Sequence, residues 1–241
     1  MVQELGSTIP PKDQRVGAMS EIAAPKRLRR SKAEQRAASL EQILDAAEYL
    51  FSMNGFYGVT LRDVAQKVGI HTTLLHYYFK DKHHLFEAVF KRRAGVTCER
   101  RMAALEKYET EAGDRPSVEG ALHAFLDTDF DLYIEGGEPW VNYGAFCARV
   151  SNSNEGAEMM VAHFDPVVLK LVSILKRALP NWSEEDIFWG YDFVTGALMH
   201  ALARTGRIDR LSGGVCRSND IPAVKKRMAK FMAAGFLALK P

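Results

Sequence analysis

The chain has 241 residues, of which 47% are hydrophobic and 26% are charged, and its formal net charge is +2. This balance is that of an ordinary globular protein, and it excludes collagen-like, disordered and coiled-coil-only chains. The three cysteines, Cys98, Cys147 and Cys216, stand far apart without a CxxC pair. We therefore expect neither a disulfide framework nor a sulfur-ligated zinc site, and a reducing, cytoplasmic location.

Neither membrane attachment nor export is expected. The longest apolar run, Phe231–Leu239, has nine residues, whereas a helix needs about 18 to cross a bilayer. The first residues also lack the basic start and apolar stretch of a secretory signal.

The charge is unevenly distributed along the chain. Residues 1–93 hold 15 lysines and arginines against 10 acidic residues, whereas residues 94–241 hold 17 against 20. The densest basic cluster follows three prolines and has few bulky apolar residues, which predicts a flexible arm over residues 1–35. Such an arm is either a solvated tail or a DNA contact that neutralises phosphates or enters a minor groove. The cluster comprises Lys26, Arg27, Arg29, Arg30, Lys32 and Arg36.

A first helix is predicted from Ser39 to Gly55. Apolar residues recur there with a period near 3.6, from Leu40 to Phe51. Ser39 and Gln42 have the spacing of a capping box, although the basic residues upstream could extend the helix toward its N-terminus. Gly55 supplies a stop.

The next segment has the spacing of a helix-turn-helix. Thr60 and Asp63 begin a short helix with a small residue, Ala65, on its apolar face, and Gly69 provides the turn. A second short helix follows, and its outward side chains would meet base edges and phosphates in the major groove. We expect Ile70, Leu75, Tyr78 and Phe79 to point inward and Thr72, Thr73, His76 and Tyr77 to point outward.

The segment Ile43–Phe90 resembles the N-terminal domain of TetR-type transcriptional regulators. The resemblance implies an all-α homodimer with a three-helix DNA-binding head and a larger C-terminal body for effector binding and dimerisation. This chain departs from the family at His71, where Ser or Thr is usual, and at His76, where an aromatic residue is usual. The DNA-contacting residues that the resemblance implies are Thr60, Arg62, Thr72, Thr73, Tyr77 and Lys82.

Four histidines near the recognition helix do not form a convincing metal site. His71 and His76 are five residues apart, which is an awkward helical spacing for a shared metal, and the adjacent His83 and His84 project about 100° apart. We expect no metal, and we interpret His76 as a groove-facing contact.

The remaining sequence reads as helices, so the fold class is all-α. The head spans residues 36–93 and the body residues 94–241, with breaks at glycines and prolines. The expected helices are 81–107, 117–135, 140–150, 156–179, 183–206 and 221–239.

Enzymatic activity is not expected, and neither is a cofactor. The chain has no GxSxG, GxGxxG, GxxxxGK or HExxH motif. The carboxylates Asp127, Asp129, Asp131 and Glu135 are assigned to a solvated helix face.

The body is rich in aromatic and other bulky side chains, most of which a helical core would bury in any case. The family resemblance implies an apolar effector chamber among residues 117–193. The residues expected to line it are His123, Phe125, Trp140, Tyr143, Phe146, Cys147, Met160, His163, Phe164, Trp189 and Phe193.

The helices 183–206 and 221–239 combine small residues such as Gly196 and Ala234 with apolar ones such as Phe188 and Phe231. A monomeric core would look similar, but operator binding needs two heads held about 34 Å apart, which favours a dimer bundle.

These features predict a ligand-responsive regulator. We expect a homodimeric repressor that binds a pseudo-palindromic DNA operator and is released by a small apolar or aromatic effector. The alternatives are a sequence-tolerant DNA-binding protein and a helical partner-binding protein whose head no longer binds DNA.

Overall fold

The computed structural model describes residues 31–239, apart from the side chains at positions 154, 155 and 157. Those residues form nine α-helices and no strand, so the all-α prediction is confirmed. None of these helices is long and apolar enough to span a membrane. The helices are α1 Lys32–Asn54, α2 Leu61–Val68, α3 Thr72–Tyr78, α4 Lys82–Ala112, α5 Val118–Val150, α6 Asn154–Ala178, α7 Glu184–Ala203, α8 Arg207–Leu211 and α9 Ile221–Ala238.

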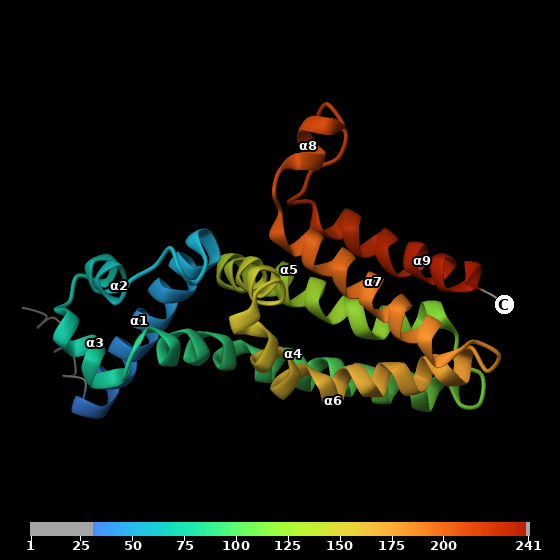
Figure 1. Ribbon diagram of the computed structural model, residues 1–241, viewed down its shortest axis with the longest axis horizontal. Helices are drawn as coiled ribbons and strands as arrows, with labels where there is room; N and C mark the ends of the chain where they lie inside the picture. Colours follow the sequence, from blue (N-terminus) through green and yellow to red (C-terminus); the bar gives the residue numbers. More distant parts are fainter. Residues whose placement is uncertain (1–30, 240–241) are drawn as a thin grey trace, which may run out of the picture.

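The molecule is elongated, with a small head at one end (Figure 1). Helices α1, α2 and α3 build this head, and α4 runs out of it into a body that also contains α5, α6, α7 and α9. The short helix α8 stands out from the body between α7 and α9. Helix α4 therefore contacts both parts: it packs on α1 in the head and on α5 and α6 in the body.

Helix α1 begins earlier than the sequence indicated. Ser31 is its N-cap: its hydroxyl accepts from the Glu34 N–H at 3.2 Å, and the Glu34 carboxylate accepts from the Ser31 N–H at 2.7 Å. Of the two starts left open, the structure has the one upstream of Ser39, and residues 32–35, which were assigned to the arm, are helical. The cause is that a complete capping box lies upstream and is followed by good helix formers. The earlier basic residues, including Arg29 and Arg30, lie outside the described part of the chain.

A buried carboxylate holds α1 against α4. Glu48 is almost inaccessible to solvent, and it accepts hydrogen bonds from Arg92 Nη2 and Arg93 Nε, both at 2.8 Å. Arg92 Nη1 also donates to Asp45 at 2.8 Å. Breaking a buried ion pair leaves a charge uncompensated, so these contacts fix the head on α4.

The connections in the C-terminal half refine the expected elements. The break predicted near residues 136–139 is a kink inside α5, where Gly137 has φ 64° and ψ −149° and Pro139 follows. Helix α8 was not predicted, because five residues are too few to show a helical period. This helix lies within residues 204–220, which we call the α8 arm, and this segment is the largest difference from the expected topology.

The body core contains an ion pair that the sequence concealed. Asp129, assigned above to a solvated face, is only 6% exposed, and its carboxylate accepts from Arg101 Nε at 2.8 Å and from Arg101 Nη2. The Arg101 guanidinium lies 4.2 Å from the centre of the Phe125 ring. Asp129 shares the inward stripe of α5 with Phe125 and Phe130, whereas its partner comes from α4, 28 residues away.

We expect Arg101→Met to lower the free energy of unfolding by about 3–5 kcal/mol, because Asp129 is then left buried without a partner. The double variant Arg101→Met/Asp129→Leu should recover most of this loss, since two apolar side chains replace the pair. Urea unfolding measures both effects.

The neighbouring Arg100 supplies a control. Its ion pair with Glu135 is exposed on both sides, so Arg100→Met should change stability by less than about 1 kcal/mol. Equal losses for the variants at positions 100 and 101 would contradict the assigned role of the buried pair.

Candidate DNA-binding head and effector-binding core

The helix-turn-helix has the local geometry that the sequence predicted. Thr60 caps α2: its hydroxyl accepts from the Asp63 N–H at 3.2 Å, and Asp63 Oδ2 accepts from the Thr60 N–H at 2.8 Å. The Thr60 hydroxyl also donates to Asp63 Oδ2 at 2.7 Å, and this bond, together with the one from the Thr60 N–H, holds the pKa of the Asp63 carboxyl below its ordinary value. Gly69 ends α2 in the left-handed region, with φ 77° and ψ 33°, where a side chain would be strained.

The recognition helix α3 presents the expected outward face. Thr73, His76 and Tyr77 are exposed and Thr72 is half-buried, whereas Leu75 is fully buried. The Tyr77 side chain is 64% exposed. At the family departure, His71 is the N-cap residue but makes no side-chain capping bond, so α3 begins without the cap that Ser or Thr would provide.

Arg36 lies against the recognition helix, and it is a candidate DNA contact that the site prediction did not include. Its guanidinium is 5.2 Å from the centre of the Tyr77 ring and 5.8 Å from that of Tyr78, whose hydroxyl donates to the Arg36 carbonyl oxygen at 3.3 Å. The sequence showed Arg36 only as part of a basic cluster. Its pairing with α3 depends on how α1 crosses the head.

Lys82 does not extend freely toward solvent. Its ammonium donates to the Phe56 carbonyl oxygen at 2.9 Å and lies 4.2 Å from the centre of the Phe56 ring. The side chain therefore ties the start of α4 to the loop between α1 and α2. A phosphate contact by Lys82 would have to share this ammonium with the loop.

The remaining expected DNA contacts, Thr60 and Arg62, are both exposed at the start of α2. The head thus presents exposed polar side chains on α1, α2 and α3, and contacts join Arg36 of α1 to α3.

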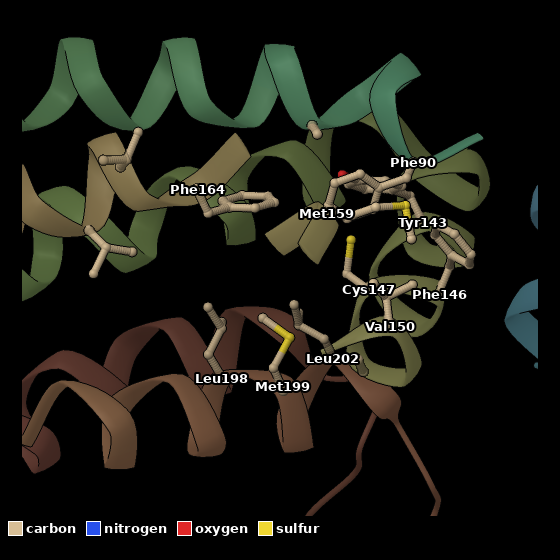
Figure 2. Close-up of a cluster of buried hydrophobic side chains, with 14 of the residues drawn as sticks. Phe90, Tyr143, Phe146, Cys147, Val150, Met159, Phe164, Leu198, Met199 and Leu202 are labelled. Atoms are coloured by element: carbon tan, nitrogen blue, oxygen red, sulfur yellow. The ribbon is translucent and has the colours of Figure 1, made fainter. Parts of the chain in front are cut away.

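The body core is a buried cluster from four helices (Figure 2). Phe90 comes from α4, Tyr143 and Cys147 from α5, Phe164 from α6 and Met199 from α7. Figure 2 shows the Cys147 and Met199 side chains directed into the space between the helices. Burial raises the pKa of the Cys147 thiol to about 12, so this cysteine stays uncharged and lines the core with a polarisable sulfur atom.

Most of the expected chamber residues meet in this core. Five are buried and three are half-buried at its edge. The hydroxyl of Tyr143 is buried without a hydrogen bond of good geometry among the described residues and has only a weak interaction with the Cys147 thiol, so it could bond a ligand. The buried five are Phe125, Tyr143, Phe146, Cys147 and Phe164, and the half-buried three are Trp140, Met160 and His163.

Three expected chamber residues lie elsewhere. Trp189 and Phe193 are 54% and 58% exposed and stack on each other outside the core, with ring centres 6.2 Å apart. His123 bonds Asp127 at 3.1 Å near the start of α5, at the opposite end of this helix from Tyr143. Trp189 and Phe193 therefore do not line the core, because aromatic residues occur on both faces of α7 and the sequence did not separate the faces. His123 lines a separate cleft between the start of α5 and the end of α9.

Arg149 connects the body to the head. Its Nε donates to the Ser52 carbonyl oxygen at 2.8 Å and its Nη2 to that of Met53 at 3.0 Å. These carbonyls belong to the last turn of α1 and have no partner further along that helix. The end of α5 thus caps the end of α1.

Two family models match the chain. Residues 43–89 match the bacterial regulatory proteins of the tetR family, and residues 123–235 match the tetracyclin repressor-like C-terminal domain. The chain belongs to the TetR family. It is thus a DNA-binding transcriptional regulator rather than an enzyme.

Individual relatives are distant. The transcriptional regulator BetI of Escherichia coli is 24% identical over 166 residues, which are 69% of this chain and 83% of BetI. A TetR-like regulator from Rhodococcus sp. RHA1 shares the fold with a TM-score of 0.56 at 20% identity, covering 87% of this chain and 100% of that one. FadR of Bacillus subtilis, solved with stearoyl-CoA, has a TM-score of 0.50 at 17% identity and covers 81% and 98% of the two chains.

The contact between Arg36 and Tyr77 leads to a prediction about DNA binding. Arg36→Ala should weaken binding to specific and random DNA by similar factors and lower the salt slope by about one, because one phosphate contact is lost. Lys91→Ala is the matched control: Lys91 is exposed on α4 and pairs with Glu87. Fluorescence anisotropy at several salt concentrations gives the salt slopes of both variants. An unchanged slope for Arg36→Ala would contradict the proposed contact of Arg36 with a phosphate.

Proposed function

We propose that this TetR regulator is a homodimeric repressor that binds a pseudo-palindromic operator and is released when a small, mainly apolar effector enters the body core. The observation that carries the proposal is the position of Phe146. Its ring centre lies 5.0 Å from that of Phe86, 6.3 Å from those of Phe51 and Tyr143, and 6.4 Å from that of Phe90. One side chain of α5 therefore contacts both the head and the proposed effector site.

The head has the parts needed to read DNA. Thr73, His76 and Tyr77 are the side chains of α3 that would reach base edges, while Thr60 and Arg62 at α2 would contact phosphates. Arg36 would add a phosphate contact beside Tyr77. Lys82 would act mainly by holding the α1–α2 loop against α4.

The chemistry of the core limits the effector. Aromatic rings, aliphatic side chains and sulfur atoms favour an apolar ligand, and the Tyr143 hydroxyl can donate one hydrogen bond to it. The Arg101–Asp129 pair is already neutralised internally, so the core does not require a charged ligand. We therefore infer an apolar or aromatic effector with one hydrogen-bond acceptor.

Release of DNA would follow from the two links between body and head. An effector that displaces Tyr143 also displaces Phe146, and the shift of α5 reaches α1 through Arg149. Such a ligand changes the operator affinity only by its differential affinity for the two head positions. A coupling of about 1–3 kcal/mol would lower operator affinity about 5- to 150-fold.

The dimer interface is assigned to one end of the α7–α9 pair. Phe188, Trp189 and Phe193 of α7 and Phe231 and Leu237 of α9 are exposed there, although they are large and apolar. The close contact of Gly190 with the Phe236 ring shows that these two helix ends lie side by side. An exposed apolar patch of this kind marks a protein interface, and a second copy would bury it while setting the spacing of the two heads.

The decisive experiment is the selection of genomic DNA fragments by the full-length protein, followed by footprinting. Protection of two half-sites about one helical turn apart supports the proposal. Equal affinity for random DNA would show a sequence-tolerant DNA-binding protein, and no binding at low salt would show a head that no longer binds DNA.

Tyr143→Phe tests the effector site. Compounds from an apolar and aromatic library that raise the thermal midpoint of the wild-type protein serve as probes. The variant should need about tenfold more compound for the same release of operator, since one hydrogen bond is lost. Its operator affinity and thermal midpoint without compound should not fall, because the hydroxyl has no good partner inside the protein. An unchanged dose response would return Tyr143 to a purely structural role.

Phe193→Glu tests the interface. It should raise the dimer dissociation constant by about 30-fold or more, because a charge would be buried in the contact. Leu169→Glu is the matched control, since Leu169 is equally exposed but lies on α6. Sedimentation velocity measures both variants, and equal dissociation constants would place the interface elsewhere.

A further inference from the structure

The arm between α7 and α9 covers a cleft that the proposed function does not use. The cleft has a volume of about 520 Å³ and lies between the C-terminal half of α7, the arm 204–220 and the N-terminal half of α9. This volume is in the range of small-molecule sites. The exposed aromatic side chains assigned to the dimer lie at the other ends of α7 and α9, so a second copy bound there would leave the cleft open.

The cleft has a largely apolar lining on its two helices. The alanines at 197 and 201 of α7 leave room, and Val224 and Met228 of α9 form the opposite wall. The arm adds Ile208 and Val215, and Val215 is 87% exposed. Apolar side chains that remain open to solvent at a concave site favour a ligand with an apolar part.

Three arginines from three elements also line this cleft. Arg204 ends α7, Arg217 belongs to the arm and Arg227 to α9. Within the described range 31–239, none of them forms an ion pair with a carboxylate. Arg204 is also the one non-glycine residue in that range with a positive φ, 43°. Positive charge is thus concentrated at an apolar cleft, and the protein offsets it only in part: Arg217 interacts electrostatically with Asp209, and Arg227 Nη1 donates to the Ala223 carbonyl oxygen at 2.8 Å.

The acidic groups nearby are engaged in shaping the arm. Asp220, which lines the cleft, caps α9 by accepting from the Ala223 N–H at 3.0 Å. Asp209 accepts from the Ser218 N–H at 3.1 and 3.0 Å, and the Ser212 hydroxyl accepts from the Cys216 N–H at 2.9 Å. The arm is therefore held in shape by its own hydrogen bonds, and the arginines keep donors for a ligand.

We propose that this cleft is a second small-molecule site, which binds an organic anion with a carboxylate or phosphate headgroup and an apolar chain. The headgroup lies among Arg204, Arg217 and Arg227, because guanidinium groups recognise both kinds of anion. The chain lies along the alanine, valine and isoleucine surface. This site is separate from the core around Tyr143 and does not depend on the function assigned to that core.

A native cysteine at the cleft supplies the measurement. Cys216 is exposed and lines the cleft, whereas Cys147 is buried with a raised pKa. The full-length protein is treated with iodoacetamide, an uncharged reagent, and peptide mass spectrometry follows the labelling of Cys216. Octanoate, octyl phosphate and octan-1-ol are the probes.

Octanoate or octyl phosphate should slow Cys216 labelling about fivefold at saturation, because the bound chain covers the thiol. The stronger of the two identifies the preferred headgroup. Octan-1-ol should protect much less. Equal protection by the alcohol, or no saturable protection by either anion, would overturn the proposal.

Arginine variants locate the headgroup. Arg204→Gln and Arg217→Gln should each raise the half-protecting concentration about tenfold, since a charged hydrogen bond is lost. Arg210→Gln is the control, because Arg210 is exposed on α8 but does not line the cleft. Tyr143→Phe should not change the protection. An equal effect of the substitution at position 210 would show unspecific attraction to the positive charge of residues 204–220 and refute the site.

Discussion

The packing of Phe146 between head and body is the contact on which the regulation proposed here depends. This ring closes the body core on one side and touches the aromatic side chains of the head on the other. Phe146 is fully buried among these rings, so a displacement of its ring changes its contacts with both groups. Arg149 adds a polar link beside it, and the Glu48 ion pairs fix α1 on α4. The head is therefore rigidly attached to the helices that would sense an effector.

The buried polar groups of the body core are of two kinds, those bonded within the protein and those without a good partner. Arg101 and Asp129 stabilise the body as a neutral pair and are satisfied by each other, whereas Tyr143 carries a hydroxyl that the protein leaves without a good partner. An unsatisfied buried donor destabilises the empty protein by roughly 1–3 kcal/mol, and a ligand that accepts its hydrogen bond regains this free energy. A related reasoning applies to the cleft beside residues 204–220, where three arginines keep guanidinium N–H groups that no described carboxylate accepts from.

The two faces of the α7–α9 pair show how one helix hairpin can serve several purposes. Its inner face closes the body core, one end of its outer face carries large exposed aromatic side chains, and the other end forms the basic cleft with the arm. Because the ends are separated along the helices, dimerisation and anion binding need not compete. The arm is what makes the cleft concave, since it adds a third wall to the groove between two helices.

The sequence by itself determined the local features. Helical periodicity, the capping residues of α2 and the turn glycine at 69 specified the helix-turn-helix, because these signals act over a few residues. Only the tertiary structure decided which side chains from distant segments meet: Arg101 with Asp129, Arg36 with Tyr77, and Arg149 with the end of α1. It also placed Trp189 and Phe193 outside the core. Burial and pairing depend on how whole helices cross, and a single helix with apolar residues on two faces does not reveal which face is covered.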